Sequence, residues 1–539
     1  MPICATLCYT KGMIVTPQLL WEGYDRHKLP LNISVISTVE MPECILSNLY
    51  FNGEKTLDGV VRIFAKFYKA TNIYAARRSA IVVFDDIENG VDGFDAAPYI
   101  AQGYSVLVVD YAGVTDFKSR FTLYPPSLDN ANFFLYPEKL EDCQEPNKTC
   151  WYAWGCVAMR SITFLESHSF SHIFALGFGH GGEHIYKLCY FDNTVKAGAT
   201  VFSGGLVNPS TAFLASLHAS AYTQNLKSPI FMQVTSNEQN GLLDNMNEVF
   251  DTADEGRIYL SIVEHANRVI DANRALNPLA FFNTFIEDQI LPLPPVIKPK
   301  GSQSKLYYDI KVFNPELVQD ITFYVAHATE NSAFRSWRNT PLQMLGEGEY
   351  LAHVPVLLEN EPLFTFVNVH YKNGLIFSSY IEEVIPKTLG AVAIELQRKR
   401  LIYDSDNGLS EWMIPNNVSA SKLSMQNGPF ELEGISSEVH RLITFRLADP
   451  QYRGPEDATL QLMLYSPQKQ NITFTIQSSQ NLACFECVKE VVSNHQWVKL
   501  TLTTKDFKGS TGHLSRWDDV LTFEIGGEDT YLINSVLWV

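Results

Sequence analysis

Residues 172–182 read HIFALGFGHGG, an apolar run that leads directly into a glycine-rich turn. The run 172–177 is typical of a buried strand, and the residues after the turn have a helical pattern. Small residues at both ends of such a turn let the strand and the helix approach closely, while the middle residue takes a strained backbone conformation. The sequence therefore predicts a sharp strand-to-helix turn with a positive φ at Gly179.

The same alternation of strand and helix extends over residues 80–290 and predicts a mainly parallel sheet with helices on both faces. A helix is expected at Ala153–Glu166, and the stretch Gly59–Ala70 is expected to form antiparallel lead-in strands. The predicted strands of the sheet itself are Ala80–Phe84, Tyr104–Asp110, His172–Gly177, Ala197–Phe202, Ile230–Thr235 and Arg257–Val263.

Three stretches carry a resemblance to a known family: the run from Trp151 to Gly182, the strand and turn FMQVTSNE at 231–238, and the strand end at 262–265. Together they resemble acetyl xylan esterases and dienelactone-hydrolase-like proteins, over roughly residues 55–290. In that family a helix with a WY-type start precedes a G-x-S-x-G-G nucleophile elbow, and the acid and histidine follow in that order. The resemblance implies an α/β-hydrolase fold.

The resemblance also implies a set of site residues. The nucleophile position falls on Gly179, which has no side chain, the acid on Glu238 and the base on His265. The backbone N–H of His180 would be an oxyanion donor. The sequence Asp85-Asp86 stands where the family often has His-Gly, and carboxylates there would oppose a developing negative charge.

Each of these residues also has a simpler interpretation. Gly179 is then an ordinary turn glycine, Glu238 a loop carboxylate and His265 a surface or core histidine. His180 is either a substitute nucleophile or only the bulky residue after the turn. Ser203, at another strand end, offers a hydroxyl but is expected to lie in a loop.

The rest of the chain is predicted to be all β. The hydrolase region is expected to occupy residues 1–290 and a Pro-rich linker residues 291–304, starting with LPLPPVIKPK. Residues 305–390 are then an immunoglobulin- or fibronectin-like sandwich that serves as a spacer or dimerising module, and residues 400–539 a jelly-roll sandwich. The last sandwich resembles carbohydrate-binding modules, so three tryptophans are candidates for stacking on sugars or for core packing: Trp412, Trp497 and Trp517.

Composition narrows the class of partner. The net charge of −18 argues against nucleic acid and anionic membranes. No signal peptide or membrane span is evident, and nine cysteines, an odd number, do not form a disulfide framework, so a cytoplasmic location is expected. The Cys484–Cys487 pair is interpreted as structural. No cofactor and no metal are expected, and the oligomeric state is left open.

Three functions follow from these features. The leading hypothesis is a catalytically degenerate esterase homologue that binds or scaffolds, around a carbohydrate or a small acyl ester. The first alternative is an active carboxylic-ester or thioester hydrolase with a non-standard nucleophile. The second alternative is a structural or assembly protein. A Ser or Cys side chain within hydrogen-bond reach of His265 would favour the enzyme.

Overall fold

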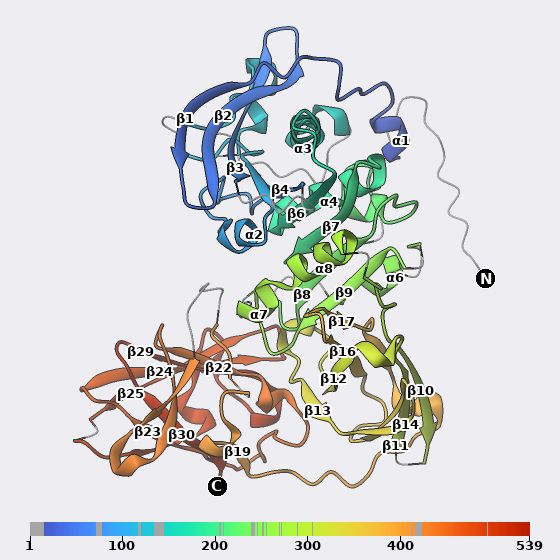
Figure 1. Cartoon of the computed structure of the whole chain (residues 1–539). Helices are drawn as coiled ribbons and strands as arrows, with labels where there is room; N and C mark the ends of the chain where they lie inside the picture. The colour runs from blue at the N-terminus through green and yellow to red at the C-terminus, as the bar shows by residue number, and fades with distance from the viewer. Residues whose placement is uncertain are drawn as a thin grey trace. The chain divides into compact units, whose positions relative to one another are not determined.

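The chain forms two compact units (Figure 1). Unit 1 comprises Met1–Gln233, Asn245–Leu260 and Leu276–Pro292, and unit 2 comprises Val234–Asp244, Ser261–Ala275 and Leu293–Val539. The computed structural model describes residues 16–71, 78–116, 120–133, 145–203, 206–207, 210–238, 243–244, 246–250, 253–254, 256–268, 270, 272–287, 289–303, 305–410, 412–415, 423–492 and 494–539.

A nine-stranded mixed sheet organises unit 1, in the order β1-β2-β3-β5-β4-β6-β7-β8-β9. The neighbours from β1 to β5 pair antiparallel, and those from β5 to β8 pair parallel. The strands are β1 (Ser34–Glu40), β2 (Cys44–Lys55), β3 (Val60–Ala70), β4 (Ser79–Phe84), β5 (Ser105–Val109), β6 (His172–Phe178), β7 (Val195–Val201), β8 (Ile230–Thr235) and β9 (Ile258–Val263).

Helices cover both faces of this sheet, with α3 and α4 on one side and α2 and α8 on the other (Figure 1). Thr149 caps α3 by accepting a hydrogen bond from the backbone N–H of Tyr152, which fixes where the helix begins. The α-helices among the described residues are α1 (Pro17–Leu20), α2 (Ala97–Ala101), α3 (Cys150–Glu166), α4 (Glu183–Phe191), α5 (Ala212–Ser216), α6 (Met246–Phe250), α7 (Ala272–Ala275) and α8 (Asn277–Ile286).

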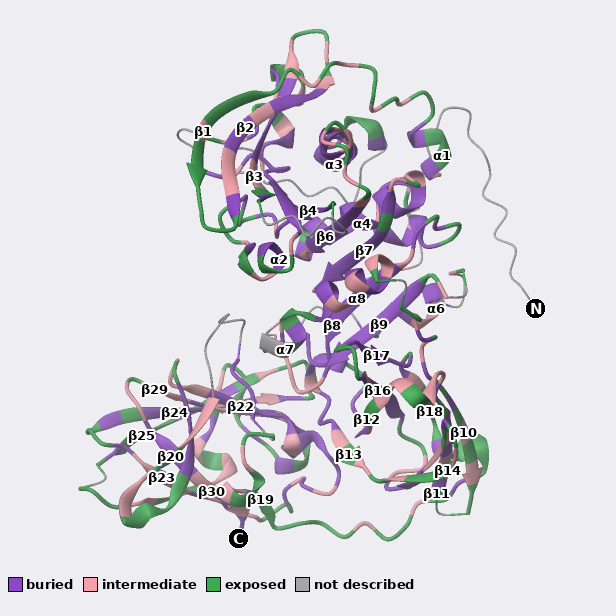
Figure 2. Cartoon of the chain, in the orientation of Figure 1, coloured by how far each residue is buried: buried purple, intermediate pink, exposed green. Residues whose placement is uncertain are grey.

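The predicted strands of the parallel sheet all form, with ends that differ by no more than two residues. They were recognisable because the central strands β4, β6, β7 and β8 are buried on both faces (Figure 2), and such strands are continuous apolar runs. Among the described residues, no helix is long and apolar enough to span a membrane.

Unit 2 contains two pairs of antiparallel sheets. In the first pair, one sheet has the order β10-β11-β15-β14 and the other β13-β12-β16-β17, with β18 beside β16. Their strands are β10 (Val296–Ser302), β11 (Lys305–Lys311), β12 (Val318–His327), β13 (Arg338–Thr340), β14 (Leu342–Gly346), β15 (Glu349–Pro355), β16 (Leu363–Tyr371), β17 (Ile376–Ser378) and β18 (Glu382–Val384).

The second pair forms the C-terminal part of unit 2. One sheet has the order β20-β21-β30-β23-β26 with β19 beside β30, and the other β22-β29-β24-β25-β27-β28. Inward side chains of both sheets form one core, to which Leu462 and Phe474 belong. The strands are β19 (Leu401–Asp404), β20 (Leu423–Asn427), β21 (Glu433–Ser437), β22 (Arg441–Thr444), β23 (Leu460–Tyr465), β24 (Gln470–Ser478), β25 (Cys484–Val491), β26 (Val498–Leu502), β27 (Lys508–Gly509), β28 (Gly512–His513), β29 (Val520–Gly527) and β30 (Leu532–Trp538).

One element differs from the sequence prediction. Residues 296–302 lie in the stretch predicted to be a stiff linker, but they form strand β10, which pairs with β11 along its length. Pro299 is tolerated there because β10 is an edge strand of its sheet, where one side of the backbone needs no hydrogen-bonding partner.

Candidate functional site

The turn after β6 has the geometry that the glycine pattern predicts. Strand β6 ends at Phe178, a 3-10 turn covers Gly179–Gly182, and α4 begins at Glu183. Gly179 has a φ of +48°, in the left-handed region that favours glycine. A Cβ atom on Gly181 would collide with the backbone carbonyl of Phe84, so only glycine fits where this turn crosses β4.

A carboxylate covers the turn. Oδ1 of Asp86 accepts a 3.1 Å hydrogen bond from the backbone N–H of His180 and lies 3.2 Å from Nδ1 of the His180 ring. A Cβ atom built on Gly179 would lie 2.5 Å from the same Oδ1. Asp86 therefore occupies the room that a side chain at position 179 would need, and it binds the N–H that the sequence predicts as an oxyanion donor.

This carboxylate is ionised at neutral pH. Partial burial raises the pKa of Asp86, but hydrogen bonds from the side chain and the backbone of His180 outweigh it and lower the pKa to about 2. The neighbouring Asp85 behaves differently, because burial raises its pKa. Oδ1 of Asp85 accepts hydrogen bonds from the Asp86 backbone and the Asn89 side chain, which fixes the loop after β4. A negative charge is thus held beside the His180 N–H, the group that the sequence predicts as an oxyanion donor.

The start of α4 carries polar groups inside the protein that the sequence analysis did not single out. His184 is fully buried, with neither ring nitrogen hydrogen-bonded to a described residue, and its ring packs edge-on against Tyr111. Burial lowers the pKa of Lys187 to about 8; its Nζ donates to the Glu183 carbonyl oxygen, 3.2 Å away. His184 and Lys187 stand three residues apart, which places both side chains on one face of the helix, and this spacing could have identified them in the sequence.

Ser203, the hydroxyl considered from the sequence, is buried directly beside the turn. A Cβ atom on Gly182 would collide with its side chain, and its Oγ has no hydrogen-bond partner among the described residues. It lies just after β7, as the sequence predicts, but the structure gives it no exposed hydroxyl.

Glu238 and His265 lie on adjacent loops of unit 2. The loop after β8 is joined to the loop after β9 by a 2.9 Å hydrogen bond from the Asn237 backbone N–H to the Ala266 carbonyl oxygen. Glu238 is only 2% exposed, with Oε1 lying 3.7 Å from Nε of Arg268. Their arrangement with Gly179, which belongs to unit 1, stays a prediction.

The surroundings of His265 are partly apolar. Its ring lies 6.2 Å from that of Tyr324, edge to face, and its φ is +49°. Burial lowers the pKa of His265, although the neighbouring Glu264 acts in the opposite direction. The imidazole is therefore neutral at pH 7, the form that a general base requires.

Of the three tryptophans considered for sugar stacking or for core packing, two take the packing role. Trp412 is 2% exposed and Trp517 is 1% exposed, and both belong to the core between the last two sheets. The reason is that face-to-face packing of sheets needs large inward side chains. Trp497 is half-buried; its Nε1 donates to the Pro429 carbonyl oxygen at 3.0 Å, and its ring packs on Gly434.

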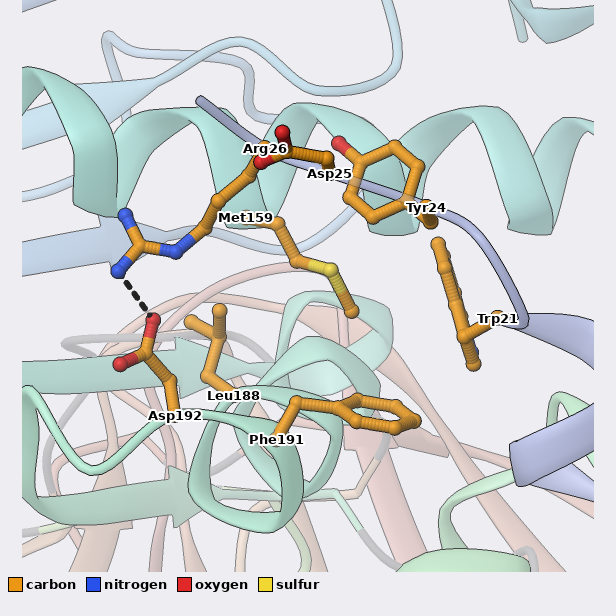
Figure 3. A pocket seen from close by; sticks show the side chains of 8 residues that line it. All are labelled: Trp21, Tyr24, Asp25, Arg26, Met159, Leu188, Phe191 and Asp192. Carbon is orange, nitrogen blue, oxygen red and sulfur yellow. Dashed lines mark ion pairs between the residues drawn. The ribbon is translucent and has the colours of Figure 1, made fainter. Parts of the chain in front are cut away.

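A cavity of about 240 Å³ opens in unit 1 between the segment after α1 and helices α3 and α4 (Figure 3). On one side it is bounded by the ion pair in which Nη2 of Arg26 lies 2.8 Å from Oδ2 of Asp192. Because Arg26 is also paired with Glu166, its charge is already neutralised and leaves no cationic anchor for a ligand. Its apolar lining consists of Trp21, Met159, Leu188 and Phe191.

No group of three or more His, Cys, Asp or Glu side chains that could hold a metal ion occurs in the part of the chain that the structure describes.

Comparison with known proteins gives matches in three dimensions only. No protein-family model matches the chain, and no curated protein matches its sequence. An acetyl xylan esterase from Paenibacillus sp. R4 aligns at 12% identity and a TM-score of 0.38, over 49% of this chain and 91% of that one. Acetyl xylan esterase 1 from Thermoanaerobacterium sp. JW/SL YS485 aligns at 14% identity and 0.36, over 48% and 89%.

A cold-adapted esterase from an Arctic intertidal metagenomic library aligns at 11% identity and a TM-score of 0.31, over 47% of this chain and 97% of that one. Dienelactone-hydrolase-like proteins are also among the matches. The structural neighbours are thus of the kinds that the sequence resemblance names, at low identity and over about half of the chain. Similarity at this level assigns no activity to the chain.

Proposed function

We propose that the chain is a catalytically degenerate homologue of acetyl xylan esterases that acts as a binding or scaffolding protein around carbohydrate. The observation that carries the proposal is the position of Asp86. Its carboxylate fills the space beside Gly179 and accepts a hydrogen bond from the backbone N–H of His180. One residue thereby removes both the room for a nucleophile and the donor for an oxyanion.

The missing nucleophile and the occupied oxyanion donor both act against the same reaction. Acyl transfer by the triad mechanism needs a side-chain nucleophile and N–H donors directed at the developing oxyanion. At position 179 there is no side chain, and an ionised carboxylate competes with any oxyanion for the His180 N–H. Glu238 and His265 belong to this proposal as relics of the acid and the base.

The test is a hydrolysis assay of the full chain on p-nitrophenyl acetate and on acetylated xylan. We expect no turnover above that of a heat-denatured sample, and the same result for His265→Ala. Clear turnover that His265→Ala abolishes would contradict the proposal, because it would show a working triad with a nucleophile elsewhere. Turnover that survives His265→Ala would refute the assignment of His265 as the relic base.

One observation favours the alternative, an active hydrolase without a serine. The His180 ring is 53% exposed and hydrogen-bonded to Asp86, which is the pairing that orients a general-base imidazole. In this alternative His180 activates a water molecule. Turnover that disappears in His180→Ala but persists in His265→Ala would support this alternative over the degenerate homologue.

A cytoplasmic location is part of the same proposal. The six cysteines that the structure describes are free thiols, which is compatible with a reducing compartment.

A further inference from the structure

The C-terminal part of unit 2 contributes to a cavity of about 200 Å³ that neither the sequence motifs nor the turn at Gly179 explain. Its floor is the outer face of the sheet formed by β22, β29, β24 and β25. Its other walls are the segment 413–415, Phe334 at the end of a 3-10 turn, and Asn267 in the loop after β9. All of these residues belong to unit 2.

The floor is polar because of strand register. Thr475 stands opposite Glu524, and Gln477 stands opposite both Thr522 and Cys484. Alternate residues of β24 point into the sandwich core, so these positions project from the opposite face. Hydroxyl and amide groups, which both donate and accept hydrogen bonds, therefore line one side of the cavity.

The charge in the floor is already balanced. Nε of Arg441 donates a 2.7 Å hydrogen bond to Oε1 of Glu524. A charged ligand would find no unneutralised counter-ion in this pair, so the pair favours a neutral ligand. The other wall is apolar, because Phe334 and Ile414 face the same space.

Asn267 supplies an independent indication of a ligand. Its side chain is 8% exposed, lines the cavity, and has an Oδ1 atom without a hydrogen-bond partner among the described residues. A buried acceptor without a donor costs free energy, and a ligand hydroxyl would satisfy it once the amide group turns toward the cavity. The cavity thus has a buried acceptor, a polar floor and an apolar wall.

We infer that this cavity binds one pyranose ring of a neutral carbohydrate, with its apolar face against Phe334 and its hydroxyls on Asn267, Thr475 and Gln477. A pyranose carries apolar C–H groups on its ring faces and hydroxyls around its rim, so it can contact an apolar wall and a polar floor together. The inference deepens the proposed function by placing its ligand site, and this site is distinct from the tryptophans that the sequence suggested.

Cys484 offers a direct readout, since it lines the cavity and is the exposed one among the described cysteines. The experiment measures its labelling by N-ethylmaleimide in the full chain, by peptide mass spectrometry, with and without methyl β-D-xylopyranoside or methyl β-D-glucopyranoside. We expect at least one pyranoside to slow the labelling of Cys484 saturably. Glycerol at the same hydroxyl concentration is the control for non-specific polyol binding.

Two variants on different elements test the assignment. Gln477→Leu and Phe334→Ala should each weaken the apparent affinity by about five- to tenfold, the effect of losing one hydrogen bond or one apolar contact. Thr473→Val is the matched control, because it lies on the same strand and face but does not line the cavity. Melting curves of all three establish that they fold.

Three results would overturn the inference: no saturable protection by either pyranoside, equal protection by glycerol, or unchanged affinity in both cavity variants. None of them depends on the hydrolysis assay, which reports on the turn at Gly179. If the chain hydrolyses esters and a pyranoside also slows the labelling of Cys484, the degenerate-esterase proposal is refuted. The inferred binding site is then still supported.

Discussion

The carboxylate of Asp86 and the backbone N–H of His180 are joined by a 3.1 Å hydrogen bond across 94 residues of sequence. The bond ties the loop after β4 to the turn after β6, so two adjacent parallel strands end in one fixed polar contact. In the proposed function, this contact occupies the place where a substrate oxygen would be held.

Substitution of Gly179 should destabilise unit 1 more than backbone strain alone explains. Gly179→Ala combines a left-handed φ with a collision against Asp86, and we expect a loss of about 2–4 kcal/mol in the free energy of unfolding. Gly23→Ala is the matched control: its φ is +74° but nothing lies within 4 Å of the added Cβ, so about 1 kcal/mol is expected. Urea denaturation followed by tryptophan fluorescence measures both. Equal losses would show that Asp86 does not crowd the turn.

Restoring a nucleophile should require two changes. Gly179→Ser alone is expected to be inactive, because Asp86 both crowds the side chain and occupies the His180 N–H. Adding Asp86→Ala frees that donor, and one such donor contributes about 10²–10³-fold in rate. We therefore expect p-nitrophenyl acetate hydrolysis at least about a hundredfold faster in the double variant than in Gly179→Ser. Addition of His265→Ala should abolish the gain; a gain that persists would exclude His265 as the base.

The buried Lys187 should make stability depend on pH in the alkaline range. Burial lowers its pKa from 10.5 to about 8, so between these values the unfolded chain binds more protons and stability rises with pH. Lys187→Met should therefore be more stable than the natural chain at pH 7, by about 2 kcal/mol, and the difference should shrink by pH 9.5. Unfolding midpoints at both pH values measure it, with the exposed Lys196→Met as control. A difference in stability that does not change with pH would show that folding does not lower the pKa of Lys187.

Trp517 should be a structural residue. Its ring lies 5.0 Å from that of Trp538 and 5.7 Å from that of Phe507. Trp517→Ala should cost about 3–5 kcal/mol, whereas Trp497→Ala, at a half-buried site, should cost less. Thermal melting compares the two. A Trp517→Ala chain that melts like the natural one would contradict the core assignment.

The sequence was informative where burial is complete. Strands β4 to β8 are covered on both faces, so they stand out as apolar runs, and the spacing of glycines around Gly179 identifies the turn that follows β6. These features depend on local sequence, which is why their positions could be predicted within two residues.

The features that could not be predicted depend on pairing between distant segments. The acidic pair after β4 could be seen in the sequence, but its contact with His180 is set by the path of a loop. Whether Trp412 and Trp517 face inward depends on strand pairing, and Pro299 is allowed in β10 because that strand lies at an edge. The floor of the unit 2 cavity is likewise a product of register between β24 and β29.

The contact between Asp86 and the turn at Gly179 also bears on how such a chain can change through evolution. A serine that arises at position 179 meets a carboxylate, and loss of that carboxylate alone leaves a glycine with nothing to attack. Under the proposed function neither single variant gains hydrolysis, and the first one is expected to lose stability. Under that proposal, one substitution at position 179 or 86 is enough to lose a hydrolytic site, whereas its return requires changes at both positions.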